Sequence, residues 1–369
     1  MVHYKMLLRH LTQVAPQHFG VLCQQNTPTA EMLQKDFPFR MKCLFSPEHG
    51  WYGFAGPGEK TAHDFHPQWL IPIHSLYGEH RKPTPAMFKG IQRVVVDLQD
   101  LGVRCYTYLA TLKYMLEACA ENHIAVTVLD RPIPLGGVVD GPMREIAFTS
   151  FVAPLNIPLC HGMTPGECAT YIKREECLDL DLTVIKMKDW SHADRAPWTN
   201  FVPPSPGIRN WDTAALYPAT VFTEAFPSID CDRQGALAFR VLGAPWLDAK
   251  RIIADTAGAL PSCGMGARLI KYKPQGGPYV GQVLDGILLS IENPDAYYPV
   301  TGGSMVFALI WQRHRTEFTE GANLQWLDKL SGSHEFVESL HGDAFNKLLQ
   351  QWIDELEVYI PKRVNLYGE

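Results

Sequence analysis

The sequence predicts an α/β protein in which a parallel sheet, covered by helices on both faces, is followed by a smaller α+β domain. Three observations support this fold class. Short aliphatic and β-branched runs alternate with helical patterns up to about residue 187. Beyond residue 200 the alternation becomes irregular. The 369 residues are enough for two hydrophobic cores, and we place the domains at 1–215 and 216–369.

The first domain is predicted to consist of buried strands and the helices between them. Its strands are rich in aliphatic residues, as in the RVVVDL run at 93–98. Thr164-Pro165-Gly166-Glu167 has the form of a capping box with proline at the first helical position, so we assign Glu167 to a helix cap. In order, we expect strands at 19–23, 41–45, 93–98, 125–129 and 182–187, and helices at 30–36, 85–90, 109–122 and 164–173.

The second domain mixes its elements differently. The preceding segment at 201–209, FVPPSPGIR, contains too much proline for regular structure, and we interpret it as a linker or as a rigid rim of a site. We expect strands at 237–242, 267–272 and 282–291, and helices at 303–313 and 343–359.

Composition excludes several classes of protein. Apolar residues make up 46% of the chain and charged residues 20%, which is typical of globular proteins. A net charge of −6 without a basic run argues against nucleic acid as a partner. No apolar run has the length of a membrane helix, and the N-terminus is too polar for a signal peptide. Nine cysteines without a CxxC pair indicate reduced thiols, so we expect a cytoplasmic protein.

Polar side chains follow four successive predicted strands. In parallel sheets, ligands bind beyond the carboxyl ends of the strands. The convergence therefore predicts a binding site at one edge of the sheet. The residues that follow the four strands are, in order, Gln25 and Asn26; Glu48 and His49; Gln99, Asp100, Arg104, Tyr106 and Tyr108; and Asp130 and Arg131.

The second of these strands leads into a glycine-rich loop. Glu48 and His49 stand beside Trp51 and Tyr52, a combination that suits a sugar site, although Glu48 in a merely local pair is equally compatible. The loop is not GxGxxG and no helix follows it, which disfavours a nucleotide site. The His63-Asp64-Phe65-His66 stretch fits no ordinary zinc spacing.

Two other charged groups have simpler interpretations. Asp97 lies inside a strand, and we interpret it as a structural hydrogen-bonding group. Asp130 and Arg131, which precede Pro132, are compatible either with a local turn-stabilising pair or with the site. The sequence leaves this choice open.

An ordered series of motifs spans most of the chain. Its segments are FSPEHGWYGFAGPGEK (45–60), SLYG (75–78), KPTPAM (82–87), DLQDLGVRCYTYLATL (97–112), LDRPIPLGG (129–137), HGMTPGE (161–167), VPPSPGI (202–208) and GAPWLDA (243–249). This series resembles the exo-β-N-acetylmuramidase family of peptidoglycan recycling. The resemblance implies a Rossmann-like first domain, a smaller second domain and a site in the cleft between them. It implies release of N-acetylmuramic acid (MurNAc) from the non-reducing ends of peptidoglycan fragments, with the glutamate of the PEHG motif, here Glu48, as the catalytic residue.

The chain departs from the family's usual motifs at several polar positions. Ile133 replaces the asparagine of DRPNP, and Gly207 with Arg209 replaces part of PSPNIP. Of the NxSEGRGT stretch, only Arg233 and a shifted glycine, Gly235, remain. These departures concern groups that hold sugar hydroxyls or the acetamido group, so they bear on the substrate more than on the fold.

Glycoside cleavage needs an acid and usually a second carboxylate. We expect Glu48 to be the acid, because desolvation by Trp51 and Tyr52 would favour its protonated form. Asp100 is our first candidate for the second group and Asp130 the next, unless the substrate's acetamido oxygen takes this role. Arg104 or Arg131 would bind the lactyl carboxylate, with Tyr106 or Tyr108 against the sugar face. The full set of expected substrate-binding residues is Asn26, His49, Arg104, Tyr106, Asp130, Arg131, His161 and Arg233.

Two other functions remain open at this point. A protein that binds amino sugars or peptidoglycan fragments without catalysis would keep the fold and the aromatic site. A metal-dependent hydrolase using His49, His63 and Asp100 fits the residues less well. We expect a small sugar or peptidoglycan fragment as ligand, and neither a metal ion nor a cofactor.

Overall fold

The computed structural model describes residues 2–15, 18–24, 27–194, 201–340 and 342–368. Its main feature is a mostly parallel seven-stranded sheet of order β3-β4-β2-β1-β5-β6-β9, which confirms the predicted fold class. The strands of this sheet are β1 (Phe19–Cys23), β2 (Met41–Ser46), β3 (Asp64–Phe65), β4 (Pro72–Ser75), β5 (Arg93–Asp97), β6 (Ala125–Leu129) and β9 (Leu182–Ile185).

The central strands are apolar because both of their faces are covered. All five residues of β1 are buried, and so are all five of β5. β1 lies between β2 and β5, and the chain adds strands first on one side of β1 and then on the other. Such a reversal creates the crevice at the carboxyl ends of the strands in which ligands of α/β proteins bind.

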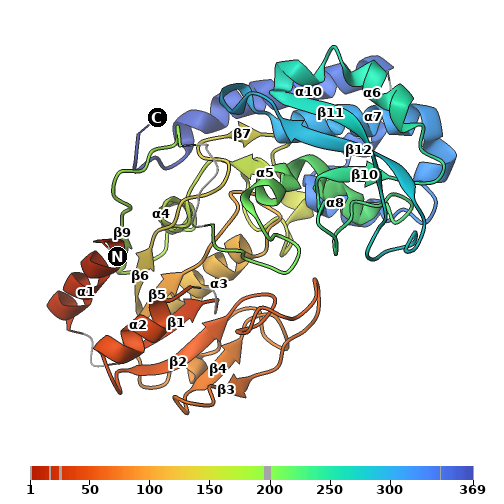
Figure 1. Cartoon of the computed structure of the whole chain (residues 1–369). Coiled ribbons are helices and arrows are strands. Elements are labelled where there is room, and N and C mark those ends of the chain that lie inside the picture. The colour runs from red at the N-terminus through yellow and green to blue at the C-terminus, as the bar shows by residue number, and fades with distance from the viewer. Residues whose placement is uncertain (1, 16–17, 25–26, 195–200, 341, 369) are drawn as a thin grey trace.

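Four helices cover the two faces of this sheet (Figure 1). α1 (Val2–Val14) and α2 (Thr29–Asp36) pack on one face, and α3 (Tyr108–Glu121) and α4 (Pro165–Glu175) on the other. The predicted capping box is present at the start of α4. We did not expect α1, which buries only a narrow stripe that includes Leu7 and Leu11 against the sheet.

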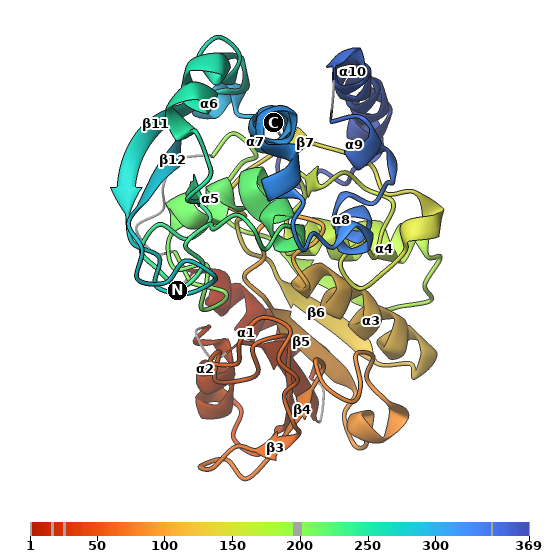
Figure 2. The same ribbon diagram turned by 90° about the vertical axis from the view of Figure 1, so that its right-hand side faces the viewer.

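The C-terminal part of the chain has a smaller antiparallel sheet of order β10-β12-β11, with helices on one side of it (Figure 2). The predicted strand at 237–242 is largely a turn, and only its end belongs to β10. We missed α5, whose residues are buried all round, so that it lacks a helical period. The elements are β10 (Val241–Gly243), β11 (Met265–Tyr272), β12 (Leu284–Ile291), α5 (Trp211–Thr220), α6 (Ala249–Thr256), α7 (Pro299–Phe318), α8 (Leu324–Ser331), α9 (Glu335–Glu338) and α10 (Gly342–Tyr359), with a separate two-stranded pair β7 (Val139–Asp140) and β8 (Cys160–His161).

The end of the chain returns to the first sheet. The Tyr359 hydroxyl donates to the carbonyl of His161 at 2.9 Å, and the Tyr367 hydroxyl donates to Asp130 at 2.5 Å. These contacts join the last residues to residues 198 and 237 positions earlier, so the two parts of the chain are held together at more than one place.

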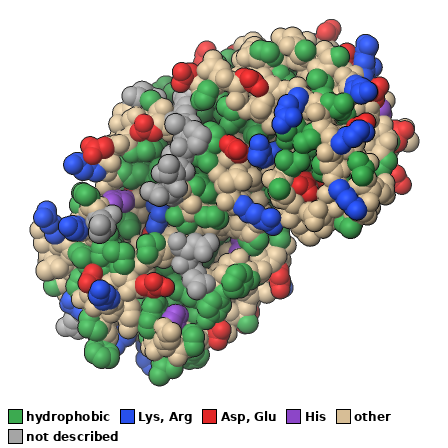
Figure 3. Space-filling model, viewed as in Figure 1, with side chains coloured by type: hydrophobic (Ala, Val, Ile, Leu, Met, Phe, Trp, Pro, Cys, Tyr) green, Lys and Arg blue, Asp and Glu red, His purple; other side chains and the backbone are tan. Residues whose placement is uncertain are grey.

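Two surface features bear on possible partners. Within the described ranges, no helix is both long enough and apolar enough to cross a membrane. On the face drawn in Figure 3, acidic and basic side chains are interspersed.

Candidate active site

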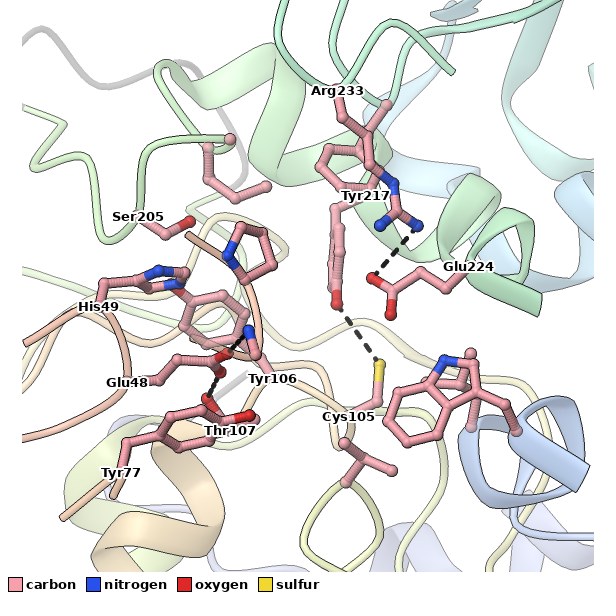
Figure 4. Close-up of a pocket in the computed structure, with 18 residues that line it drawn as sticks. Glu48, His49, Tyr77, Cys105, Tyr106, Thr107, Ser205, Tyr217, Glu224 and Arg233 are labelled. Atoms are coloured by element: carbon pink, nitrogen blue, oxygen red, sulfur yellow. Dashed lines mark hydrogen bonds and ion pairs between the residues drawn. The ribbon is translucent and has the colours of Figure 1, made fainter. Parts of the chain in front are cut away.

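A cavity of about 350 Å³ lies beyond the carboxyl ends of β2 and β5 (Figure 4). We call the side formed by Glu48, His49, Tyr77, Tyr106 and Thr107 the strand-end wall. The opposite side comes from the second part of the chain, and we call it the C-terminal wall. Its residues are Tyr217, Glu224, Arg233, Phe239 and Trp326.

Glu48 is held in place by hydrogen bonds on both carboxylate oxygens. The Thr107 hydroxyl, at the N-terminus of α3, donates to Oε2 at 2.5 Å, and the Gly58 amide donates to Oε1 at 2.7 Å. The Tyr77 side chain is a further neighbour of Glu48, and burial together with the Glu48 charge raises the pKa of Tyr77 to about 12. Two donors therefore orient the Glu48 carboxylate before any ligand arrives.

His49 adopts an unusual backbone conformation beside Glu48. Its φ of 72° lies in the left-handed region, which a residue with a side chain seldom occupies. The ring nitrogen Nδ1 is 2.8 Å from the carbonyl oxygen of Ala55, so Nδ1 carries the hydrogen and donates. In the neutral ring this leaves the Nε2 lone pair as a hydrogen-bond acceptor. Strained backbone of this kind is concentrated at functional sites.

The C-terminal wall supplies a second carboxylate, Glu224, in the 3₁₀ segment Val221–Ala225. Burial raises the pKa of Glu224, while Arg233 and the Trp326 indole counteract this and the Glu48 charge adds to it. An Arg233 nitrogen lies 3.6 Å from a Glu224 oxygen. Figure 4 shows Glu48 and Glu224 on opposite sides of the cavity.

Aromatic rings line the cavity between the two carboxylates. The rings of Tyr106 and Tyr217 are 6.2 Å apart and nearly perpendicular, and Tyr217 is 4.9 Å from Phe239 in the same manner. The proline-rich segment contributes Ser205 to the lining, so it forms part of the rim. A cavity of this size with aromatic walls and a few polar groups is typical of a small-molecule site.

Comparisons with known proteins show the family of this chain. The family model described as "Exo-beta-N-acetylmuramidase NamZ, N-terminal" matches residues 14–212, and the corresponding C-terminal model matches residues 215–367. The chain belongs to the NamZ exo-β-N-acetylmuramidase family of glycosidases. It is 34% identical over 346 residues to the peptidoglycan β-N-acetylmuramidase NamZ of Bacillus subtilis (strain 168), covering 90% of this chain and 82% of that protein.

Two solved structures from Bacteroides fragilis NCTC 9343 have the same fold. Both are crystal structures of DUF1343 family proteins. One superposes with a TM-score of 0.87 at 25% identity, covering 99% of this chain and 98% of the other. The second has a TM-score of 0.76 at 24% identity, covering 100% and 98%.

The structure places Arg104 of this NamZ family member away from the ligand position that the sequence suggested. Its side chain is fully buried and does not line the cavity. The guanidinium donates to four backbone carbonyls at 2.6–3.0 Å, and two of these belong to α8 in the second part of the chain. Because these bonds already occupy Nη1 and Nη2, Arg104 is not available to a lactyl carboxylate. The four carbonyl oxygens belong to Pro142, Ile157, Leu330 and Ser331.

The two aspartates expected as the second carboxylate also lie outside the cavity lining. Asp100 accepts from the Gly102 amide at 2.8 Å, and burial raises its pKa to about 7. Asp130 is fully buried at the start of α4, where Thr164 and the Gly166 amide both donate to it at 2.7 Å. Both carboxylates serve local structure here.

Three further residues that we expected at the site lie elsewhere in the structure. Arg131 forms a bidentate pair with Asp97, which confirms Asp97 as a structural group. His161 is fully buried, and burial lowers its pKa to about 3. Trp51 turns into the core below the sheet instead of flanking the Glu48 carboxyl.

Of the expected site residues, Glu48, His49, Tyr106 and Arg233 line the cavity. Asn26 lies outside the described residues. Glu224 was missed because it follows a helix and not a strand, so the strand-end rule does not reach it. One signal was available in the sequence: Glu224 lies nine residues before Arg233, just ahead of the divergent stretch that begins at Ser228.

Proposed function

We propose that this protein hydrolyses the β-glycosidic bond that links a non-reducing MurNAc to the rest of a peptidoglycan fragment. The observation that carries the proposal is the pair of carboxylates, Glu48 and Glu224, on opposite walls of one aromatic cavity. Hydrolysis of glycosides by an acid and a second carboxylate needs such a pair. Membership of the NamZ family supports the choice of sugar.

The two carboxylates have different surroundings, which suggests different roles. Burial raises the pKa of Glu224, so this group is suited to hold a proton and pass it to the leaving oxygen. Glu48 accepts hydrogen bonds on both oxygens, which suits a carboxylate acting as base or nucleophile. This assignment revises the sequence-based expectation of Glu48 as the acid, because Trp51 does not desolvate its carboxyl.

The remaining lining residues provide the means to hold a sugar. The Nε2 atom of His49 is positioned to accept from a hydroxyl, and the faces of Tyr106 and Tyr217 offer apolar contact to the ring. Arg233 keeps Glu224 in place. None of these steps requires a metal ion. The 2-acetamido oxygen of the substrate can replace the base or nucleophile in the same geometry.

The decisive experiment compares two disaccharides that contain the same two sugars in opposite order. Purified protein is incubated with MurNAc-GlcNAc and, in parallel, with GlcNAc-MurNAc, and products are identified by mass spectrometry. Release of MurNAc from the first alone supports the proposal. Binding of MurNAc-GlcNAc by calorimetry without any turnover would instead establish the non-catalytic binding protein.

A further inference from the structure

Arg81 is held beside the cavity by two aromatic rings. The central carbon of its guanidinium lies 4.4 Å from the centre of the Phe151 ring and 5.5 Å from that of Tyr77. These two rings are themselves 5.6 Å apart. A guanidinium stacked in this way loses less conformational entropy on binding than a freely rotating one, because part of its freedom is already restricted.

The rings that support Arg81 belong to the wall of the cavity. Tyr77 lines the cavity next to Glu48, and Val152, which follows Phe151, lines it as well. Arg81 is therefore adjacent to the strand-end wall. Its side chain is exposed to solvent.

The other arginines considered for the site are already engaged. Arg104 donates to four carbonyls, Arg131 is paired with Asp97, and Arg233 faces Glu224. For Arg81, the described part of the chain shows only the ring contacts and no carboxylate in ion-pair range. Its planar set of donors is thus free for a carboxylate from outside the protein.

The charges of the cavity lining call for a second cation when the substrate is an anion. The charged lining residues are two acids, Glu48 and Glu224, and one base, Arg233. A substrate that carries a carboxylate would meet a lining whose single cation is already opposed by Glu224. A second cation beside the strand-end wall would offset the repulsion between the substrate and the two carboxylates.

We propose that Arg81, stacked on Tyr77 and Phe151, binds a carboxylate of the substrate and thereby selects anionic glycans. The proposal rests on the proposed function of the same site. Two sources supply this chemistry in a peptidoglycan fragment: the lactyl group of the MurNAc that is released, and a carboxylate on the leaving-group side. Both present two oxygens to the guanidinium.

The test measures kcat/KM of Arg81→Ala on two substrates. In 4-nitrophenyl β-MurNAc the lactyl group is the only carboxylate, whereas MurNAc-GlcNAc-MurNAc carries a second one on its leaving group. We expect a loss of roughly 10- to 100-fold, as for a charge-assisted hydrogen bond. An equal loss on both substrates assigns Arg81 to the lactyl group, and a loss on the trisaccharide alone assigns it to the leaving group. Arg81→Lys should fall between, because lysine keeps the charge but not the stacked plane.

A matched control and a charge-free ligand separate binding from general charge effects. Arg268→Ala removes an exposed arginine on β11 and should leave both rates unchanged. The methyl ester of 4-nitrophenyl β-MurNAc should be cleaved equally by wild type and Arg81→Ala if the lactyl group is the partner. An active wild type with undiminished Arg81→Ala rates on both carboxylate substrates would overturn this proposal alone. Wild-type inactivity on every MurNAc glycoside would overturn the proposed function as well.

Discussion

The two walls of the cavity come from different parts of the chain, and the sequence predicts the residues of one wall better than those of the other. The strand-end wall comes from loops that directly follow β2 and β5, and its Glu48 and Tyr106 lie in dense motifs. The C-terminal wall comes from a helix, a 3₁₀ segment and irregular loops, and its Glu224 follows no strand. The rule that ligands bind beyond parallel strands therefore finds one carboxylate and misses its partner.

Substitution of Glu48 is the strongest test of this comparison between the two walls. Glu48→Gln should reduce kcat by ~10²–10⁴-fold, because an amide can neither act as a nucleophile nor take up a proton in this role. If Glu48 is the base or nucleophile, the loss should be similar for MurNAc-GlcNAc and for 4-nitrophenyl β-MurNAc. The matched control is Glu59→Gln in the same loop, whose carboxylate accepts from the Gly56 amide and should be dispensable. Undiminished activity of Glu48→Gln would remove Glu48 from the mechanism.

The next largest effect is expected on the opposite wall. Glu224→Gln should slow MurNAc-GlcNAc by ~10²–10⁴-fold, but 4-nitrophenyl β-MurNAc much less, because nitrophenolate leaves without a proton. A smaller defect of Glu48→Gln on the nitrophenyl substrate would instead exchange the two roles.

The same assignment predicts the pH dependence. Burial raises the pKa of Glu224, so the protonated acid persists to higher pH than an exposed glutamate would. Wild-type kcat/KM should fall as pH rises through this raised pKa, and Glu224→Gln should lack that alkaline fall. A pH–rate profile of both proteins on the disaccharide provides the measurement, and an unchanged alkaline limb in the variant would contradict the assignment.

Arg104 distinguishes a structural arginine from one that binds ligand. Arg104→Ala would leave four buried carbonyls without their donor, and we expect the free energy of unfolding to fall by about 3 kcal/mol or more. Urea unfolding at constant pH measures this, with the exposed Arg268→Ala as control. Normal stability together with a selective loss of MurNAc binding would restore Arg104 as a ligand-binding residue.

The smallest catalytic effect is expected for Asp100. Asparagine can still accept from the Gly102 amide, so Asp100→Asn should retain kcat close to wild type. The pH dependence of the free energy of unfolding should change instead. Burial raises the folded-state pKa of Asp100 from 3.8 to about 7, so wild-type stability from this group declines as pH rises between those values. Thermal melts at pH 4.5 and 7.5 should show a smaller decline in the variant, whereas a large loss of kcat would return Asp100 to the mechanism.

Much of the fold follows from local patterns that need no long-range information. The largely apolar runs at 19–23, 41–45 and 125–129 form strands because the buried strands of a parallel sheet favour aliphatic residues, and Lys42 and Thr127 are the polar exceptions. The capping box at Thr164 is encoded within four residues. The position of Glu48 at the end of β2 follows from the same strand, so one half of the candidate site could be predicted.

The sequence by itself determined five strands of the first sheet, the helices α2, α3 and α4 between them and the Glu48–His49 corner, because these depend on neighbours along the chain. Only the tertiary structure decided which arginine and which second carboxylate face the cavity. Two of the four carbonyl partners of Arg104 lie 226 and 227 positions away in the chain, and Glu224 and Glu48 line the same cavity from distant parts of the chain. Packing between distant segments leaves no periodic pattern in the sequence. A charged residue that is buried in the interior therefore cannot be distinguished, from the sequence, from one that binds a ligand.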